Sequence, residues 1–287
     1  MPSHFPSKTN KYPRCLSIAG SDSSGGAGIQ ADLKTFMALG CFGMTAITAV
    51  TAQNTLGVQG IHAVSADFLR LQIQSVIEDI GIDALKIGML HSPELVEVVA
   101  WAIEHYSLQQ VVFDPVMVAT SGDKLIAEET MEVLVKRLFP LVTLITPNLI
   151  EAGWLIKHDL KTKSDLTVAV RFLQSMGARN VLIKGGHLPG DALWDVLALA
   201  SGAQHEFSSS RIATHNTHGT GCTLSSAIAA YLALGLDLPN AVASARVFIL
   251  QALKHGASVQ TGQGHGPLNH GFSPRSMHIQ VIADITS

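Results

Sequence analysis

The segment CLSIAGSDSSGGAGIQADLKTFMAL, residues 15–39, decides the fold that we expect for this chain. It opens with Cys15–Ala19, an apolar run of strand length, and a glycine-rich turn follows. Over Ala27–Leu39 the apolar residues recur at helical spacing, which predicts a helix. A buried strand, a tight turn and a helix in this order form the repeating unit of a parallel α/β sheet.

The same order of strand, turn and helix recurs along the chain. We expect further strands at Met44–Ala52, Ala84–Ile87, Val111–Phe113, Thr143–Thr146 and Val181–Ile183. Helical patterns lie between them, including Ala66–Ile80 and a helix opened by Ser92–Glu94, where serine can cap and proline occupies the first turn. The alternation predicts an α/β fold with a central, mostly parallel sheet and helices on both faces.

We expect a single domain, because no Pro/Ser-rich or charge-rich linker divides the 287 residues. Residues 1–13 hold three prolines and several polar residues without an apolar core, which predicts a disordered N-terminal tail rather than a secretory signal. The domain is then expected over residues 14–270. Residues 271–287 form a C-terminal tail to which we assign no role.

Composition narrows the classes of function. Hydrophobic residues make up 47% of the chain and charged residues 14%, as in a well-filled core with buried strands. A net charge of −3 without a basic stripe argues against nucleic acid as a partner. The apolar runs are too short for a membrane span. Three cysteines without a CxxC pair fit a reducing cytoplasm, and the 13 histidines show no spacing typical of zinc sites.

Polar residues and glycines follow the expected strands. In parallel α/β sheets, ligands collect at the carboxyl ends of the strands, so these positions are candidates for a binding site. They also fit ordinary polar loops. The positions are Gly20–Asp22, Gln53–Asn54, Gly88–Met89, Asp114–Val116, Pro147–Asn148 and Lys184–Gly186.

A second glycine-rich stretch, His215–Cys222, runs directly into the apolar segment Thr223–Leu236. Free backbone N–H groups and the positive end of the helix dipole at Gly219–Gly221 can hold a developing phosphate anion. Cys222 falls in the first helical turn, where a thiol is biased toward thiolate and can act as a base. The alternative is a plain loop with a capped helix.

The sequence lacks two common nucleotide-binding motifs, the complete dinucleotide fingerprint and the P-loop. Gly26–Ala31 follows a strand and opens a helix, but Thr45–Gln53 carries no carboxylate to complete a dinucleotide fingerprint. The chain also has no Gly-x-x-x-x-Gly-Lys-Ser/Thr motif, so phosphate would need a different cradle, which Gly219–Cys222 can supply. Asp32, near the start of the first helix, is either a ligand-binding residue or a partner of the helix dipole.

Oxygen ligands for Mg²⁺ are available at Asp114 and at Asn148 and Glu151, which lie three residues apart at a helix start. A helix N-terminus with an early glutamate explains the latter pair equally well. Lys184 ends an apolar strand and either holds a polyphosphate or is solvated.

Two residues suit a neutral ring. The amide of Gln53 offers a donor and an acceptor to the edge of a heteroaromatic ring. Met89 can pack on the face of such a ring, although a lone methionine is more often part of the core.

The motifs together resemble those of the hydroxymethylpyrimidine/phosphomethylpyrimidine kinases of thiamine biosynthesis. The resemblance extends over about residues 14–270, with the motifs in family order, and it implies a ribokinase-like fold. The segments that carry it are Ala19–Thr35, Thr51–Thr55, Lys86–Leu90, Asp114–Met117, Thr146–Ala152, Lys184–His187 and Asn216–Cys222.

The resemblance also implies roles for individual residues. It places the pyrimidine near Gly20, Asp32, Gln53, Met89 and Val116, with Gln53 and Asp32 bonding the aminopyrimidine edge. Asp114 and Glu151 would hold Mg²⁺ together with Asn148. ATP would contact Lys184, Asn148 and Thr217. Gly219, Thr220 and Gly221 would form the anion hole, with Cys222 in the catalytic position.

The implied activity is phosphorylation of 4-amino-5-hydroxymethyl-2-methylpyrimidine by Mg²⁺-ATP, first to the monophosphate and then to the diphosphate. A monovalent cation, a homodimer and a cytoplasmic location belong to the same expectation. The alternatives are a pyridoxal/pyridoxine kinase of vitamin B6 salvage and a non-catalytic protein that binds the pyrimidine or the vitamin. Two departures are Ser23, where many relatives have proline, and the unmatched tail from about Gly271 to Ser287.

Overall fold

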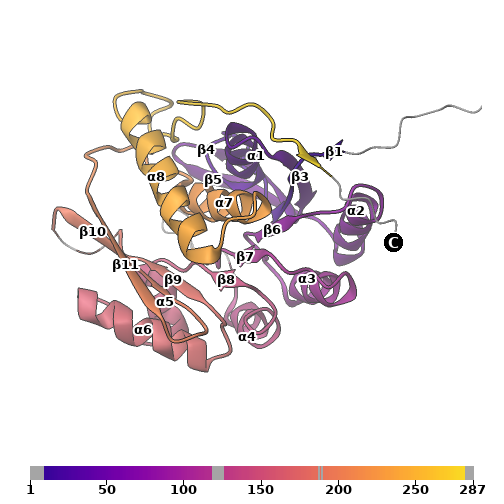
Figure 1. Cartoon of the computed structure of the whole chain (residues 1–287), viewed down its shortest axis with the longest axis horizontal. Helices are drawn as coiled ribbons and strands as arrows, with labels where there is room; N and C mark the ends of the chain where they lie inside the picture. Colours follow the sequence, from indigo (N-terminus) through magenta and orange to yellow (C-terminus); the bar gives the residue numbers. More distant parts are fainter. Residues whose placement is uncertain (1–9, 118–125, 187, 189, 282–287) are drawn as a thin grey trace, which may run out of the picture.

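The computed structural model describes residues 10–117, 126–186, 188 and 190–281. Its centre is an eight-stranded sheet with the order β11-β10-β9-β8-β7-β6-β2-β3 (Figure 1). From β3 to β9 the neighbours are parallel, while β10 and β11 are antiparallel, so the expected mostly parallel sheet is confirmed. The strands are β2 (Arg14–Ala19), β3 (Phe42–Ile47), β6 (Ala84–Ile87), β7 (Val111–Phe113), β8 (Leu144–Ile145), β9 (Val181–Lys184), β10 (Ala192–Ala198) and β11 (Gln204–Ser210).

Helices cover both faces of this sheet. One hydrophobic core joins the sheet to α1 (Gly28–Ala38), α7 (Thr220–Ala233) and α8 (Leu238–Gly256). The core on the other face includes residues of α2 (Ala66–Asp79), α3 (Pro93–His105), α4 (Glu128–Arg137), α5 (Leu149–Ile156) and α6 (Lys163–Ser175).

Alternation along the strands produces the two cores. In β7, Val111 and Phe113 belong to the core of α2–α6, whereas Val112 between them belongs to the core of α1, α7 and α8. Successive side chains of a strand point to opposite faces, so an apolar run buried on both sides is what a central parallel strand requires. Within the described residues, no helix combines the length and hydropathy needed to cross a bilayer.

The expected single strand Met44–Ala52 is wrong, because the structure divides it into two. It belongs to β3 and then to β4 (Ala49–Asn54), which leaves the sheet and pairs antiparallel with β5 (Gly57–Ala63). Thr48 lies at the break, donating its N–H to Ala19 O and its hydroxyl to Met89 O. These two bonds end the ladder with β2 and turn the chain outward, so that the β4-β5 hairpin stands beside the carboxyl end of β2.

The expected disordered tail over residues 1–13 is wrong at its end, where Asn10–Lys11 forms β1 and pairs with β12 (Gln280–Val281). Arg275 and His278 donate backbone N–H groups to Ala38 and Gly40, which ties the C-terminal segment to the end of α1. Residues 1–9 and 282–287 lie outside the described part of the chain.

An ion cluster holds the start of the chain. Asp83, just before β6, accepts hydrogen bonds from Lys11 at 2.6 Å and from the guanidinium of Arg14 at 2.9 Å. Burial alone would raise the pKa of Asp83, but these bonds lower it to about 2. The ionised form of Asp83 therefore contributes stability that is present above pH 4 and is lost as the pH falls toward 2.

We predict that Asp83→Asn lowers the free energy of unfolding at pH 7 by about 1–2 kcal/mol, because an amide cannot accept both charged donors. The difference from the wild type should shrink between pH 4 and pH 2, where the wild-type carboxylate takes up its proton. Urea unfolding at several pH values measures this difference in the free energy of unfolding, and the control is Asp79→Asn at an exposed position. An equal loss at pH 7 and pH 2 would contradict the ionic explanation.

Candidate active site

A cavity of about 670 Å³ opens at the carboxyl ends of the parallel strands. Residues far apart in the sequence meet there, because parallel strands all end at the same edge of the sheet. All but one of the predicted site residues line it. They are Gly20, Gln53, Met89, Asp114, Val116, Asn148, Glu151, Lys184, Thr217, Gly219, Thr220, Gly221 and Cys222.

The N-terminus of α7 forms one wall of the cavity. Gly219 starts this helix with a φ of 83°, a backbone conformation that favours glycine. A Cβ at Gly219 would also overlap the carbonyl oxygen of Gly26, so the two glycine-rich loops contact each other through their backbones. The first N–H groups of a helix lack acceptors within the helix, and Gly219, Thr220 and Gly221 at the start of α7 line the cavity; the Thr220 N–H also donates to the Thr217 carbonyl at 3.3 Å.

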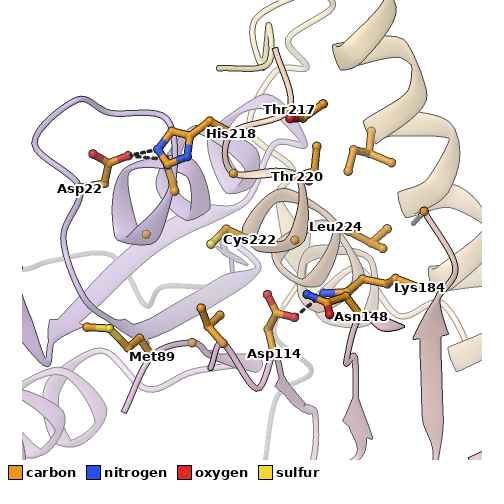
Figure 2. A pocket seen from close by; sticks show the side chains of 18 of the residues that line it. Asp22, Met89, Asp114, Asn148, Lys184, Thr217, His218, Thr220, Cys222 and Leu224 are labelled. Atoms are coloured by element: carbon orange, nitrogen blue, oxygen red, sulfur yellow. Dashed lines mark hydrogen bonds and ion pairs between the residues drawn. The ribbon is translucent and has the colours of Figure 1, made fainter. Parts of the chain in front are cut away.

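Asp22 and His218 join the same two loops, and sequence reasoning did not find this pair. The Asp22 carboxylate accepts bonds from the backbone of Ser24, Gly26 and Ala27 and from the Ser24 hydroxyl. Its Oδ2 lies 2.8 Å from His218 Nε2 (Figure 2). Each glycine-rich loop holds several polar residues, and with 196 residues between Asp22 and His218 no spacing rule singles out this pair.

Charged groups stand opposite the start of α7. Lys184 donates to Asp114 Oδ1 at 2.7 Å (Figure 2). The hydroxyl of Thr146 donates to the same oxygen at 2.9 Å. A Cβ placed on Gly221 would lie 3.2 Å from Asp114 Oδ2 and 3.3 Å from Lys184 Nζ. Burial lowers the pKa of Lys184, but the charges of Asp114 and Glu151 raise it overall, so the ammonium stays charged.

Asn148 and Glu151 form a capping box at the start of α5. The Asn148 N–H donates to Glu151 Oε2 at 2.8 Å, and the Glu151 N–H donates to Asn148 Oδ1 at 2.9 Å. The helix-capping alternative is therefore realised, yet both side chains also line the cavity. Burial raises the pKa of Glu151 to about 7, although the charge of Lys184 opposes that shift.

The chemistry of these donors fits Mg²⁺ only in company with phosphate. Asp114 and Glu151 are two carboxylates at one end of the cavity. Within the described part of the chain, no group of three His, Cys, Asp or Glu side chains is arranged to hold a metal. Magnesium in phosphoryl-transfer sites is typically bound by one or two carboxylates and the substrate phosphates, and this pair matches that pattern.

The opposite end of the cavity is lined by several apolar side chains. Met89 and Val116 line it, together with Val58 and Ile61 of the β4-β5 hairpin, which sequence reasoning missed. A Cβ on Gly20 would lie 2.9 Å from the Met89 methyl group, so glycine leaves that side chain room.

Gln53 is held in place at this end by its neighbours. Ser23 Oγ accepts the Gln53 N–H and donates to the Gln53 carbonyl, both at 2.8 Å. The hydroxyl of Thr51 donates to Gln53 Oε1 at 3.2 Å. Ser23 thus fixes the backbone of a residue that lines the cavity.

The predicted role of Asp32 at the ring edge is wrong in this structure. Asp32 is fully buried, does not line the cavity and forms an ion pair with Lys86 at 2.8 Å. It also accepts hydrogen bonds from Ser17 and Ser226. Its helical position turns it inward, against β2, β6 and α7, and spacing alone could not distinguish this from a direction toward the ligand.

The expected bias of Cys222 toward thiolate is also wrong. Burial raises the pKa of the Cys222 thiol to about 11, while the charge of Lys86 and a hydrogen bond from the Gly28 backbone only partly oppose this. The thiol form therefore dominates at neutral pH. Cys222 is only partly exposed, and the cost of desolvating a thiolate there outweighs what the helix N-terminus contributes, which the sequence did not reveal.

An apolar wall beyond Lys184 completes the cavity and was not anticipated. Leu193, Ile212 and Leu224 meet Ile249, Leu250 and Leu253 of α8 there. The sequence shows α8 as an amphipathic helix, and such a pattern does not tell a ligand-lining face from an ordinary core face.

Fold and site together define a class of protein. A parallel sheet carries at its carboxyl edge a helix N-terminus for an anion, a lysine, two carboxylates and apolar surfaces on both sides. These features define a small-molecule phosphotransferase of the α/β class.

Comparison with known proteins identifies the family. A family model described as phosphomethylpyrimidine kinase matches residues 22–269, and the chain belongs to that family. The hydroxymethylpyrimidine/phosphomethylpyrimidine kinase of Escherichia coli (strain K12) is 46% identical over 91% of this chain and 98% of its own length. The thiamine biosynthesis bifunctional protein ThiED of Geobacter sulfurreducens is 48% identical, and the chain spans 53% of that protein.

Solved structures agree with the fold. A Bacillus subtilis pyridoxal kinase in complex with ADP superimposes with a TM-score of 0.84 at 40% identity, over 91% of this chain and 98% of that chain. A phosphomethylpyrimidine kinase from Clostridium difficile 630 gives a TM-score of 0.74 at 41% identity, over 84% and 99%. The expected ribokinase-like fold and family are confirmed.

We predict that Gly219→Ala reduces the turnover of any phosphoryl transfer at this site by at least about 100-fold, because the methyl group pushes the anion hole away from Gly26. The control is Gly235→Ala, since Gly235 has a φ of 90° but open space around it. Steady-state kinetics and thermal unfolding of both variants separate the effects. Similar activity in the two variants would show that the contact between Gly219 and Gly26 does not control catalysis.

Proposed function

We propose that this chain transfers the γ-phosphoryl group of ATP to the hydroxymethyl oxygen of 4-amino-5-hydroxymethyl-2-methylpyrimidine, and then transfers a second one to the phosphate just installed. The observation that carries this proposal is the position of the α7 N-terminus between two apolar ends of one cavity. One end suits the small ring of the acceptor and the other the base of a nucleotide. Relatives with this pair of activities in their name share most of the chain.

ATP would occupy the end of the cavity lined by α8, with its phosphates directed toward Lys184, Asn148 and Thr217. Asp114 and Glu151 would hold Mg²⁺, which would supply positive charge to neutralise the phosphates. The N–H groups at Gly219–Gly221 would stabilise the charge on the transferred group. Positioning and charge neutralisation account for most of the catalysis in such reactions.

The pyrimidine would lie at the end formed by Gly20, Met89 and Val116. The side chain of Gln53 would bond its aminopyrimidine edge, because the amide supplies a donor and an acceptor. Asp32 lies behind this end and has no part in the contact.

Cys222 would accept the proton of the alcohol in the first transfer. The hydroxymethyl O–H bond breaks, the proton passes to the thiolate form of the sulfur to give the thiol, and the oxygen bonds the γ-phosphorus as ADP leaves. The second acceptor is already anionic and does not depend on a base in this way.

We predict that the first transfer accelerates with pH up to about pH 9, by up to tenfold per pH unit, because the thiol pKa of about 11 leaves thiolate scarce at pH 7. Cys222→Ala should slow the first transfer more than the second and abolish the steep pH dependence. Single-turnover assays of both steps between pH 6.5 and 9 measure this, with Cys41→Ala as the control. Equal losses in both steps would exclude the base role.

A pyridoxal kinase is the second candidate, favoured by the superposition on the Bacillus subtilis pyridoxal kinase. A product assay decides between the two. Purified protein, Mg²⁺-ATP and either the pyrimidine or pyridoxal are incubated with and without K⁺, and products are read by mass spectrometry. We expect mono- and diphosphate from the pyrimidine. Phosphate on pyridoxal alone would assign the enzyme to vitamin B6 salvage, and no product would favour a binding protein.

We further propose a homodimer in the cytoplasm. Val50 and Leu56 of the β4-β5 hairpin expose large apolar side chains, which a second copy can cover. All three cysteines are free, as in a reducing compartment. Light scattering after size-exclusion chromatography tests the dimer, and a monomer at micromolar concentration would contradict it.

A further inference from the structure

A fully buried lysine, Lys86, lies at the catalytic end of the cavity and has no role in the function proposed so far. Lys86 of β6 and Asp32 of α1 are both 0% exposed. The Lys86 ammonium lies 2.8 and 2.9 Å from the two carboxylate oxygens of Asp32. Ser17 of β2 donates to one of these oxygens at 2.5 Å and Ser226 of α7 to the other at 2.6 Å. The carboxylate is thus fixed by donors from three further elements.

The connection through α7 places this ion pair beneath Cys222. Ser226 follows Cys222 by four residues in the helix, so both side chains lie on the same face, one turn apart. The face that carries Ser226 to Asp32 therefore also directs Cys222 toward Lys86. Lys86 contributes to the lining of the cavity, as Cys222 does, whereas Asp32 does not. The ammonium lies between its carboxylate partner and the cavity.

Fold stability does not explain such a pair. Removing two charges from water is costly, and well-packed apolar residues of similar volume often stabilise a core as well or better. Small, fully buried side chains at Ser17 and Ser226 show that the surroundings are built to satisfy the carboxylate. Because burying the Lys86 ammonium at the edge of the cavity costs free energy, its positive charge is expected to contribute to the chemistry of the site.

Charged groups from several elements influence the Cys222 thiol. Lys86 and Lys184 are cations, and Asp32 and Asp114 are anions. Burial is the largest influence and raises the pKa of the thiol, while Lys86 is the largest influence that lowers it and outweighs Asp32. Burial would also lower the pKa of Lys86, but the charge of Asp32 raises it above its ordinary value, so the cation persists.

We propose that Lys86 is a positioning residue for the first transfer, holding a permanent positive charge beneath Cys222 and so favouring the thiolate that accepts the alcohol proton. Asp32 keeps the ammonium charged and in place. The proposal rests on the proposed function for the identity of the reaction, but the effect of Lys86 on the thiol is a property of the protein without substrate.

The test is the rate at which Cys222 is alkylated by iodoacetamide and by iodoacetate at pH 7–9, with the modified cysteine identified by peptide mass spectrometry. Lys86→Met should slow both reactions by about tenfold or more, one pKa unit of the thiol being a factor of ten in thiolate. Loss of the cation should also lower the ratio of the iodoacetate rate to the iodoacetamide rate. A change in access alone would leave that ratio constant.

Two further variants keep the test decisive. Lys86→Met leaves Asp32 unpaired in the interior, so the double variant Lys86→Met, Asp32→Asn is made as well; its amide can still bond Ser17 and Ser226. We expect the double variant to show the same direction of change. Lys136→Met removes an exposed cation from α4 and should match the wild type. Unchanged alkylation rates in the folded double variant would overturn the proposal.

Kinetics of the two transfers form the second arm. The first transfer should fall in parallel with alkylation, while the second should change less. Slower alkylation with an unchanged first transfer would overturn the role of Lys86 in proton transfer. If the product assay gave no pyrimidine phosphate while alkylation responded as expected, the proposed function would fall, and the influence of Lys86 on the thiol would stand.

Discussion

The close contact between two glycine-rich loops is the constraint on which the site depends. Gly26 and Gly219 approach through backbone atoms, and a side chain at Gly219 would collide with the Gly26 carbonyl. The Asp22–His218 pair then closes the junction from the side. Because α7 begins directly after this junction, the contact fixes where the helix N-terminus stands above the sheet edge. The anion hole is thus positioned by backbone packing, which deforms less than a flexible side chain would.

Electrostatics follow the same principle of fixed charge. Each buried lysine near the catalytic end is paired with an aspartate: Lys184 with Asp114 and Lys86 with Asp32. The carboxylates are held in turn by hydroxyl groups, and the lysines therefore stay charged in a poorly solvated place. Such preorganised charges need no rearrangement when negative charge develops during transfer. Both lysines line the cavity, and Met89 and Val116 give it an apolar surface where the ring is proposed to bind.

Much of the fold and of the candidate site could be predicted from the sequence, and the predictions that were wrong share one cause. Short apolar runs separated by helical patterns predicted the sheet. The rule that ligands bind at the carboxyl ends of parallel strands predicted that Asp114, Asn148 and Lys184 lie at one edge of it. The strand Met44–Ala52 could not be divided correctly, because β-branched residues continue through Thr48 and only the bonds of Thr48 to other segments reveal the break. The predictions for Asp32 and Cys222 were wrong because the burial of a side chain depends on neighbours that are distant in sequence.

The difference between Asp32 and Gln53 shows what the cavity selects. Had Asp32 faced the ring, the acceptor would have met a carboxylate, which favours a protonated or strongly donating edge. Instead, the Asp32 carboxylate forms an ion pair with Lys86. The neutral amide of Gln53, whose position is fixed by Ser23 and Thr51, lines the cavity. A neutral donor–acceptor pair matches an aminopyrimidine edge and gives no net attraction to a charged ring. In the proposed function, the ring end would therefore discriminate by hydrogen-bond pattern, and charge would act at the phosphate end, where both successive acceptors meet the same donor.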